Sequence, residues 1–400
     1  MQIEKQQIIW QELFFAIACF IQGATVVISS FVLTITMQDS WMIAFTGLIS
    51  VSLLAWLYIR ILWRYPGKNL IQINDLVLGP IVGKLFSVLY IFFFLTLASL
   101  NTRDMGTFVV NNIMPETPIA IVIIMFLFVC AWAVRSGIGN MMKYAFIFMM
   151  MAFMVISITT PPLLGSMSPQ NFLPMFSLPL AKYIQATHIV TVIPLGEILA
   201  FTMIIPQVKD QSKVPKAIAL GLGVGTLLMV MILCRDIATL GNLATLMSLS
   251  SFEAIRTINL WEVISRMEVL YATAMVTLQF FKVSILYYAG VVGLAQLCGL
   301  QHYRSVVGVY GVLIANYAQI VFHSATENAA WGTQTAPFFS SFFVIVLPAL
   351  TMLVILMRKL PVQFQPQQGQ QGQQGQQSQK GQKGQKSQQA QTAAEGGSKA

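Results

Sequence analysis

The sequence predicts an all-α membrane protein in which ten helices span the bilayer as two inverted halves of five. Of its 400 residues 56% are hydrophobic and only 9% are charged, against about 25% charged residues in a typical soluble domain. Apolar runs of about 20 residues, the length that crosses the hydrocarbon layer, recur along the chain. So few charged groups argue against a soluble enzyme, and against a nucleic-acid binder despite the net charge of +9.

Ten apolar segments are predicted to span the membrane: 10–35, 41–63, 81–110, 118–135, 141–160, 183–208, 215–235, 266–298, 305–323 and 335–357. The first is too long for the apolar core of a signal peptide, so we expect it to remain as a helix. Residues 1–360 should then form one transmembrane domain, with repeats at about 8–160 and 183–358. Because five is odd, the second repeat would enter the membrane from the opposite side.

The distribution of Lys and Arg sets the expected orientation. With the N-terminus inside, thirteen of these residues before position 360 fall on the inner side. Four fall on the outer side: Lys182, Arg235, Arg256 and Arg266. Both termini are therefore predicted to be cytoplasmic. We interpret Arg103-Asp104, near the outer end of the third span, as an interfacial charge pair.

Two connections on the outer side and the C-terminal tail lie outside the predicted spans. The connections are residues 161–182 and 236–265, and in the second Ser251-Phe252-Glu253, opening toward Arg256, is expected to start a short helix. The tail, 361–400, contains sixteen Gln among its forty residues, with Gly or Ser at a triplet period. It lacks the Pro-rich triplets of collagen, so we expect a disordered cytoplasmic tail.

The first and sixth spans, 10–35 and 183–208, carry helix-weakening residues near their middle. Each is the first helix of its half of the chain, so the two places match. Pro removes a backbone donor and Gly loosens the helix, so both helices are predicted to be broken. Broken helices at corresponding positions are typical of a transporter binding site. The alternative is that Gly23 only allows close packing and Pro194 only kinks its helix. The ligand-binding residues expected from the breaks are Gly23, Ala24, Thr25, Pro194, Leu195, Gly196 and Glu197.

Two charged residues are predicted to lie near the bilayer centre, where an ionisable group is costly. Glu197 either receives a ligand ammonium, binds and releases a proton, or caps the second half of its helix. Lys282 either replaces a coupling cation as a fixed positive charge or forms a structural ion pair, for which Glu197 is a candidate partner.

No residue pattern indicates an enzyme, a metal site or a cofactor site. The four cysteines contain no Cys-x-x-Cys pair, and the three histidines are far apart in sequence. We find no nucleophile–base motif and no Gly-rich phosphate loop. The protein is therefore expected to be neither an enzyme nor a binder of metal or cofactors.

Several short motifs, in their order along the chain, resemble the GerAB-type endospore germination permeases. These are the B subunits of nutrient germinant receptors in the amino acid–polyamine–organocation transporter superfamily. The resemblance covers about residues 8–358 and leaves out the tail. The motifs are Tyr65-Pro66-Gly67-Lys68-Asn69-Leu70, Leu78-Gly79-Pro80-Ile81-Val82-Gly83-Lys84, Asn171-Phe172-Leu173-Pro174, Pro194-Leu195-Gly196-Glu197, Ser265-Arg266-Met267-Glu268 and Phe281-Lys282-Val283-Ser284.

The resemblance implies a LeuT-type fold of two inverted five-helix repeats with helices 1 and 6 broken. It also implies residence in the spore inner membrane, together with an A-type membrane subunit and a C-type lipoprotein. The B subunit would sense a small nutrient, typically an amino acid, and trigger germination. Two alternatives stay open: a proton-coupled amino-acid transporter and an ion-conducting subunit of the receptor.

Overall fold

The computed structural model describes residues 7–257 and 267–359, and this part of the chain is helical with no β-strand. The predicted tail, 361–400, and the outer residue Arg266 lie outside the described residues. The helices are α1 Trp10–Thr36, α2 Ser40–Arg64, α3 Leu70–Leu78, α4 Pro80–Asn112, α5 Ile119–Ser136, α6 Ile138–Thr159, α7 Leu180–Val190, α8 Val214–Leu240, α9 Ser250–Arg256, α10 Glu268–Leu297, α11 Val307–Ile320, α12 Ala325–Ala330, α13 Ala336–Ser341 and α14 Leu347–Met357.

Eight helical segments among the described residues are long and apolar enough to cross a membrane. The first, Trp10–Arg64, contains both α1 and α2. Nine of the ten predicted spans fall on these eight segments, and the span predicted at 305–323 falls on α11, which has only 14 residues. The all-helical membrane architecture is thereby confirmed, whereas ten crossings in two inverted halves stay a prediction.

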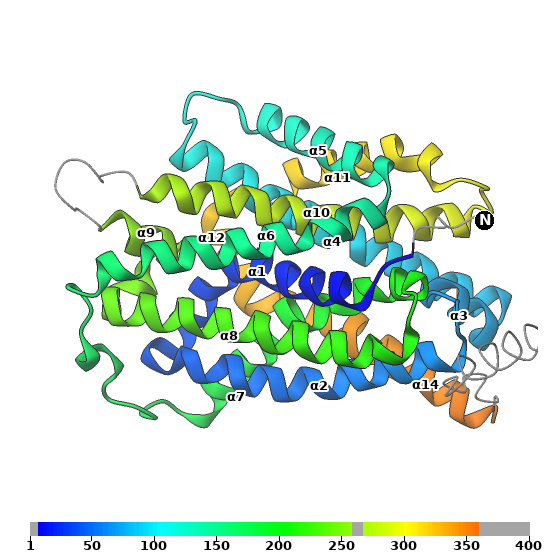
Figure 1. Ribbon diagram of the computed structural model, residues 1–400, viewed down its shortest axis with the longest axis horizontal. Coiled ribbons are helices and arrows are strands. Elements are labelled where there is room, and N and C mark those ends of the chain that lie inside the picture. The colour runs from blue at the N-terminus through cyan, green and yellow to red at the C-terminus, as the bar shows by residue number, and fades with distance from the viewer. Residues whose placement is uncertain (1–6, 258–266, 360–400) are drawn as a thin grey trace, which may run out of the picture. The chain divides into compact units, whose positions relative to one another are not determined.

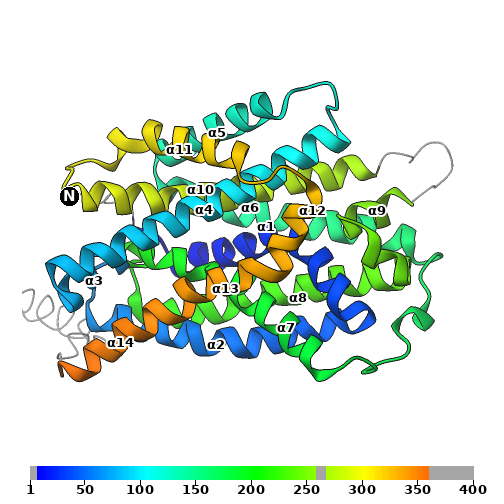
Figure 2. The same cartoon turned by 180° about the vertical axis from the view of Figure 1, so that it is seen from behind.

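Helix α1 runs through the interior of the bundle and is buried along most of its length. It packs against α6, α8 and α10, and Figure 1 shows it in the middle of the stack of long helices. The opposite view, in Figure 2, shows the run from α12 through α13 to α14 crossing the other side of the bundle. Residues near the middle of α1 therefore have protein on every side.

The predicted break in the first span is wrong, because α1 is continuous from Trp10 to Thr36. The Thr25 hydroxyl donates to the Ile21 carbonyl one turn earlier, at 2.9 Å. A Cβ at Gly23 would lie 2.9 Å from the Leu278 carbonyl oxygen of α10. Gly23 thus allows close approach of α1 and α10, which is the alternative explanation of this glycine.

The predicted break in the sixth span is confirmed as a change of helix type. After α7 ends, Thr191–Leu195 forms a π-helical turn and Gly196–Met203 a 3₁₀ helix. Pro194 has no N–H to continue the α-helical ladder. A Cβ at Gly196 would lie 2.7 Å from the Thr191 carbonyl oxygen, so only glycine fits this winding. A 3₁₀ helix of eight residues is unusually long, since runs beyond three or four are uncommon.

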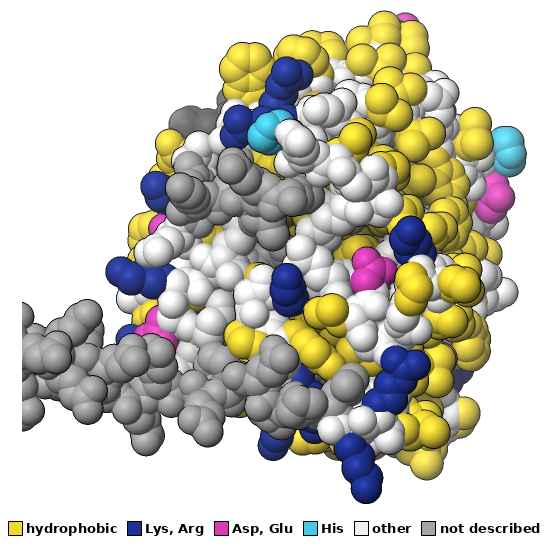
Figure 3. All heavy atoms as spheres, turned by 90° about the vertical axis from the view of Figure 1, so that its right-hand side faces the viewer, with side chains coloured by type: hydrophobic (Ala, Val, Ile, Leu, Met, Phe, Trp, Pro, Cys, Tyr) yellow, Lys and Arg dark blue, Asp and Glu magenta, His cyan; other side chains and the backbone are white. Residues whose placement is uncertain are grey.

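The two ends of the bundle differ in their charged residues and in their connections. At the end where α3 and the C-terminus of α14 lie, Figure 3 shows several Lys and Arg side chains on the surface. This is the end that the charge count predicts to be cytoplasmic. At the other end the predicted short helix is confirmed as α9. There the Asp39 carboxylate accepts from the Phe176 N–H at 3.0 Å and the Tyr183 hydroxyl at 2.6 Å, which fastens the connection 161–182 to the start of α2.

Candidate functional site

A cavity of about 60 Å³, here called the central cavity, lies beside the middle of α1. Its walls come from α1, α4, α10, the segment 191–203 and the run from α12 to α13. Phe31, Trp331 and Phe339 supply aromatic walls. The polar side chains that line it are Asn101, Asp104, Glu197, Lys282, Asn328 and Ser340. Apolar walls with a few convergent polar groups are typical of a small-molecule site.

Glu197 and Lys282 form a buried ion pair at the central cavity. The distance from Lys282 Nζ to Glu197 Oε2 is 2.7 Å, and each side chain is 2% exposed. Glu197 is the second residue of the 3₁₀ helix Gly196–Met203, and Lys282 lies in the middle of α10. Lys282 Nζ also lies 5.1 Å from the centre of the Phe20 ring, a cation–π contact. The pairing that the sequence left open is confirmed.

The other residues of the predicted ligand site divide into two groups. Ala24 lines the central cavity together with Glu197 and Lys282. Gly23, Thr25, Pro194, Leu195 and Gly196 do not line it. Those five are buried and shape the backbone and helix packing behind the cavity wall.

Arg103 and Asp104 are not an interfacial charge pair, and this prediction is wrong. The Arg103 guanidinium donates to the carbonyl oxygens of Ala318, Gln319 and Phe322, at 3.3, 3.0 and 2.9 Å. It therefore satisfies carbonyls at the C-terminal end of α11, where a positive charge is favourable. Asp104 is directed elsewhere, to Asn328 and the central cavity.

The sequence interpretation missed Asn101 of α4 and Asn328 of the last span, and it assigned Asp104 to a charge pair with Arg103. Asn101 and Asp104 are three residues apart on α4, which places them on one helix face. Such spacing of polar residues inside an apolar span was a usable signal. Asn328 and Trp331 repeat the same spacing near the start of the last span, but both lie before the range predicted for that span, 335–357.

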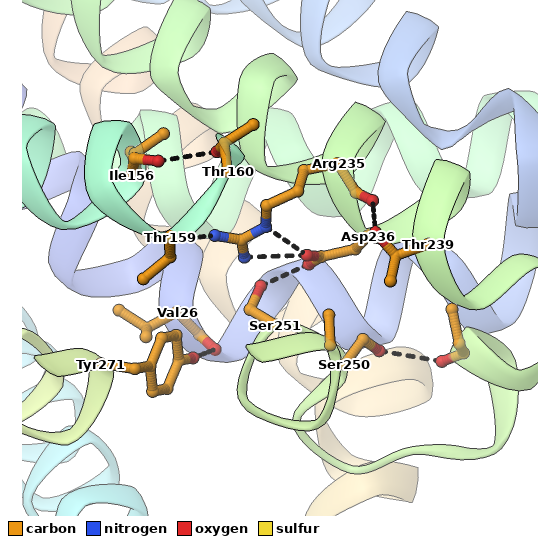
Figure 4. A network of polar contacts seen from close by, with 12 residues as sticks. Val26, Ile156, Thr159, Thr160, Arg235, Asp236, Thr239, Ser250, Ser251 and Tyr271 are labelled. Carbon is orange, nitrogen blue, oxygen red and sulfur yellow. Dashed lines mark hydrogen bonds and ion pairs between the residues drawn. The ribbon is translucent and has the colours of Figure 1, made fainter. Parts of the chain in front are cut away.

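A second buried charge pair, also missed, lies near the C-terminal end of α8. Arg235, which the charge count assigns to the outer side, is buried: its side chain is 3% exposed and its guanidinium donates twice to Asp236 Oδ1, at 2.8 and 3.0 Å. Thr159 of α6 accepts from the same guanidinium, and Ser251 of α9 donates to Asp236 Oδ2 (Figure 4). We call these four residues the Arg235 network; it joins α6, α8 and α9.

The arrangement suits binding of a small polar molecule. Among the described residues no group of three or more His, Cys, Asp and Glu side chains is placed to hold a metal ion. The charged groups at the central cavity are instead two carboxylates and one ammonium. Such groups bind a ligand through ion pairs and charge-assisted hydrogen bonds.

Comparison with known proteins assigns the family. The model of the family described as "Spore germination protein" matches residues 7–327. Spore germination protein KB of Bacillus subtilis (strain 168) is 26% identical over 362 residues, which cover 89% of this chain and 96% of that protein. Spore germination protein B2 of the same strain is 27% identical over 213 residues, 49% of this chain and 54% of that protein. Because the family match covers most of the chain, the protein belongs to the spore germination protein family of the B-subunit type.

Proposed function

We propose that this protein is the B subunit of a germinant receptor and binds a small nutrient, an amino acid, in the central cavity. The observation that supports this most directly is the buried Glu197–Lys282 pair, which lines a cavity next to a segment that is not α-helical. Charged side chains inside a membrane domain are rare and mark ligand or ion pathways. Family membership supplies the physiological context.

The proposed fold is the ten-crossing, LeuT-type arrangement of two inverted repeats, with α1 continuous and the segment 191–203 as its irregular counterpart. We further propose that both termini face the cytoplasm and that the protein resides in the spore inner membrane. Its proposed partners are an A-type membrane subunit and a C-type lipoprotein. Ala24, Glu197 and Lys282 would face the ligand, and Gly23, Thr25, Pro194, Leu195 and Gly196 would shape the wall behind them.

Binding could be followed by signalling, by transport or by ion flow. We favour signalling, because Lys282 supplies a fixed charge to Glu197 where a transporter would need an exchangeable cation or proton. The proton-coupled alternative would instead use Glu197 as the group that binds and releases a proton. The ion-conducting alternative would use the same charged groups as part of a pathway.

The test compares spores with and without this chain. Deletion should abolish germination in response to a particular amino acid, and leave uptake of that amino acid by vegetative cells unchanged. Complementation with the intact gene should restore the response. Retained germination together with lost uptake would identify an ordinary transporter and contradict the proposal.

A further inference from the structure

The Asp104 carboxylate lines the central cavity and is paired there only with a neutral group. Its Oδ1 accepts a hydrogen bond from Asn328 Nδ2 at 2.7 Å. Among the described residues, no Lys or Arg forms an ion pair with it. The neighbouring Arg103 is unsuited to this role, because its guanidinium donates to three carbonyls at the end of α11.

The charges of the central cavity consequently do not balance. Glu197 and Lys282 neutralise each other at 2.7 Å, and Asp104 is the remaining charged group of the lining. The ionised cavity thus carries one net negative charge. A carboxylate inside a membrane domain is costly unless a cation or several hydrogen-bond donors meet it. The Asn328 amide supplies one donor, which leaves Oδ2 available to another.

A further group at the same cavity lacks a partner and has the opposite hydrogen-bonding character. The indole Nε1 of Trp331, which lines the cavity, is buried and has no hydrogen-bond partner in the described part of the chain. Indole N–H groups only donate, so this one requires an acceptor. A molecule that satisfies both Asp104 and Trp331 carries a donor, which as a cation would also balance the charge of Asp104, and an acceptor such as a carboxylate.

We propose that Asp104, and not Glu197, binds the ammonium group of the ligand, and that Trp331 donates to its carboxylate. This inference rests on the proposed function and names its recognition group and ligand class: a small zwitterionic amino acid rather than a sugar or a hydroxy acid. Asn328 is a positioning residue that orients the Asp104 carboxylate. The volume of about 60 Å³ has room for only a few water molecules, which favours ligands with few non-hydrogen atoms.

The experiment uses the purified full chain and measures its thermal unfolding midpoint. The probes are the twenty standard amino acids, glucose, Na⁺ and K⁺ alone, and the 2-hydroxy acid and the decarboxylated amine that correspond to any amino acid that responds. The variants are Asp104→Asn, Asp104→Glu and Trp331→Phe. The matched control is Asp75→Asn, which removes a carboxylate on the exposed side of α3, away from the cavity.

We expect at least one amino acid to raise the midpoint of the wild type and of Asp75→Asn at equal concentrations. Asp104→Asn should need about ten- to a hundredfold more of it, the usual effect of losing a charge-assisted hydrogen bond. Asp104→Glu keeps the charge and should recover part of the response. The hydroxy acid should have no effect on the wild type, and Trp331→Phe should bind the amine as the wild type does but the amino acid more weakly.

Four results would overturn the inference, and they separate it from the proposed function. An unchanged concentration dependence in Asp104→Asn, or a hydroxy acid that acts like the amino acid, removes Asp104 as the ammonium site while nutrient binding stands. Stabilisation by Na⁺ or K⁺ alone that depends on Asp104 would make it an inorganic cation site. If no probe stabilises the wild type, the proposed nutrient binding fails together with this inference. The hydroxy-acid comparison uses only the wild type, so it decides even where Asp104→Asn does not fold.

Discussion

Replacing Glu197 by Gln should destabilise the protein by leaving the Lys282 ammonium buried without its counter-charge. Glutamine keeps the size of the side chain and some hydrogen bonding, so the change isolates the charge. The double variant Glu197→Gln/Lys282→Met removes both charges. It should recover most of the lost stability, because burying a single charge is what destabilises the first variant.

The magnitude follows from the geometry of the pair. At 2.7 Å and an effective dielectric constant of about 20, the attraction between the two charges is about 6 kcal/mol. Part of this offsets the cost of removing both groups from water, and breaking a buried pair typically costs about 3–5 kcal/mol. Lys282 retains its contact with the Phe20 ring at 5.1 Å, a cation–π interaction of about 1 kcal/mol, so the lower half of that range is expected. Such a loss is a large fraction of a folding free energy of about 5–15 kcal/mol.

The assay combines immunoblots of membranes with the thermal unfolding midpoint of the purified protein. Glu197→Gln and Lys282→Met should each lower both quantities, and the double variant should restore them. Glu116→Gln, in the exposed connection after α4, is the control that removes an equal charge at no structural cost.

The reasoning would be refuted by a Glu197→Gln protein with normal abundance and an unchanged midpoint. A shifted dose response for germination without any loss of stability would identify Glu197 as a recognition group instead. That outcome would also weaken the assignment of the ammonium to Asp104.

The remaining predictions concern helix packing, ion dependence and the Arg235 network. Gly23→Ala should lower both stability and the germination response, because its Cβ would lie 2.9 Å from the Leu278 carbonyl oxygen. The control Gly223→Ala, whose Cβ would have nothing within 4 Å, should lower neither. Equal behaviour of the two variants in immunoblots and germination assays would contradict this. Gly23→Leu should abolish the response, and a normal dose response would exclude a role for this packing. Germination should not require sodium, since the Lys282 ammonium already supplies the counter-charge to Glu197; a strict requirement when choline replaces sodium at constant ionic strength would disprove this. Asp236→Asn should lower the free energy of unfolding by about 3–5 kcal/mol, because it breaks a buried ion pair. Glu253→Gln, in the exposed pair with Arg256, should lower it by about 1 kcal/mol at most. Similar thermal unfolding midpoints for the two variants would refute the comparison.

The positions of the membrane helices were predictable from the sequence because long apolar segments have few alternatives in a bilayer. The change of helix type at Pro194 was predictable for a similarly local reason, the missing N–H. The continuity of α1 was not predictable. Gly23 weakens a helix in isolation, and the sequence does not show that α10 lies close enough to need a glycine there. Local sequence signals are therefore enough to locate the spans, whereas the continuity of α1 depends on its packing against α10.

The candidate site was predictable only for residues whose depth in a span was visible. Glu197 and Lys282 are isolated charges in apolar segments, so their burial and pairing could be expected. Arg103-Asp104 and Arg235-Asp236 each look like an ordinary pair at the end of a span. Their roles depend on partners far away in sequence, such as Asn328 for Asp104 and Thr159 for Arg235. Those partners appear only when the chain is folded.

The winding of residues 191–203 has a mechanical consequence. A 3₁₀ helix rises about 2.0 Å and turns about 120° per residue, against about 1.5 Å and 100° in an α-helix. Rewinding the eight residues Gly196–Met203 as α-helix would therefore shorten them by about 4 Å and rotate one end by about 160° relative to the other. The segment therefore couples a change of length to a rotation, and Glu197 is its second residue. Such a change would move the Glu197 carboxylate relative to Lys282 and shift the connection to α8 along the axis of the segment.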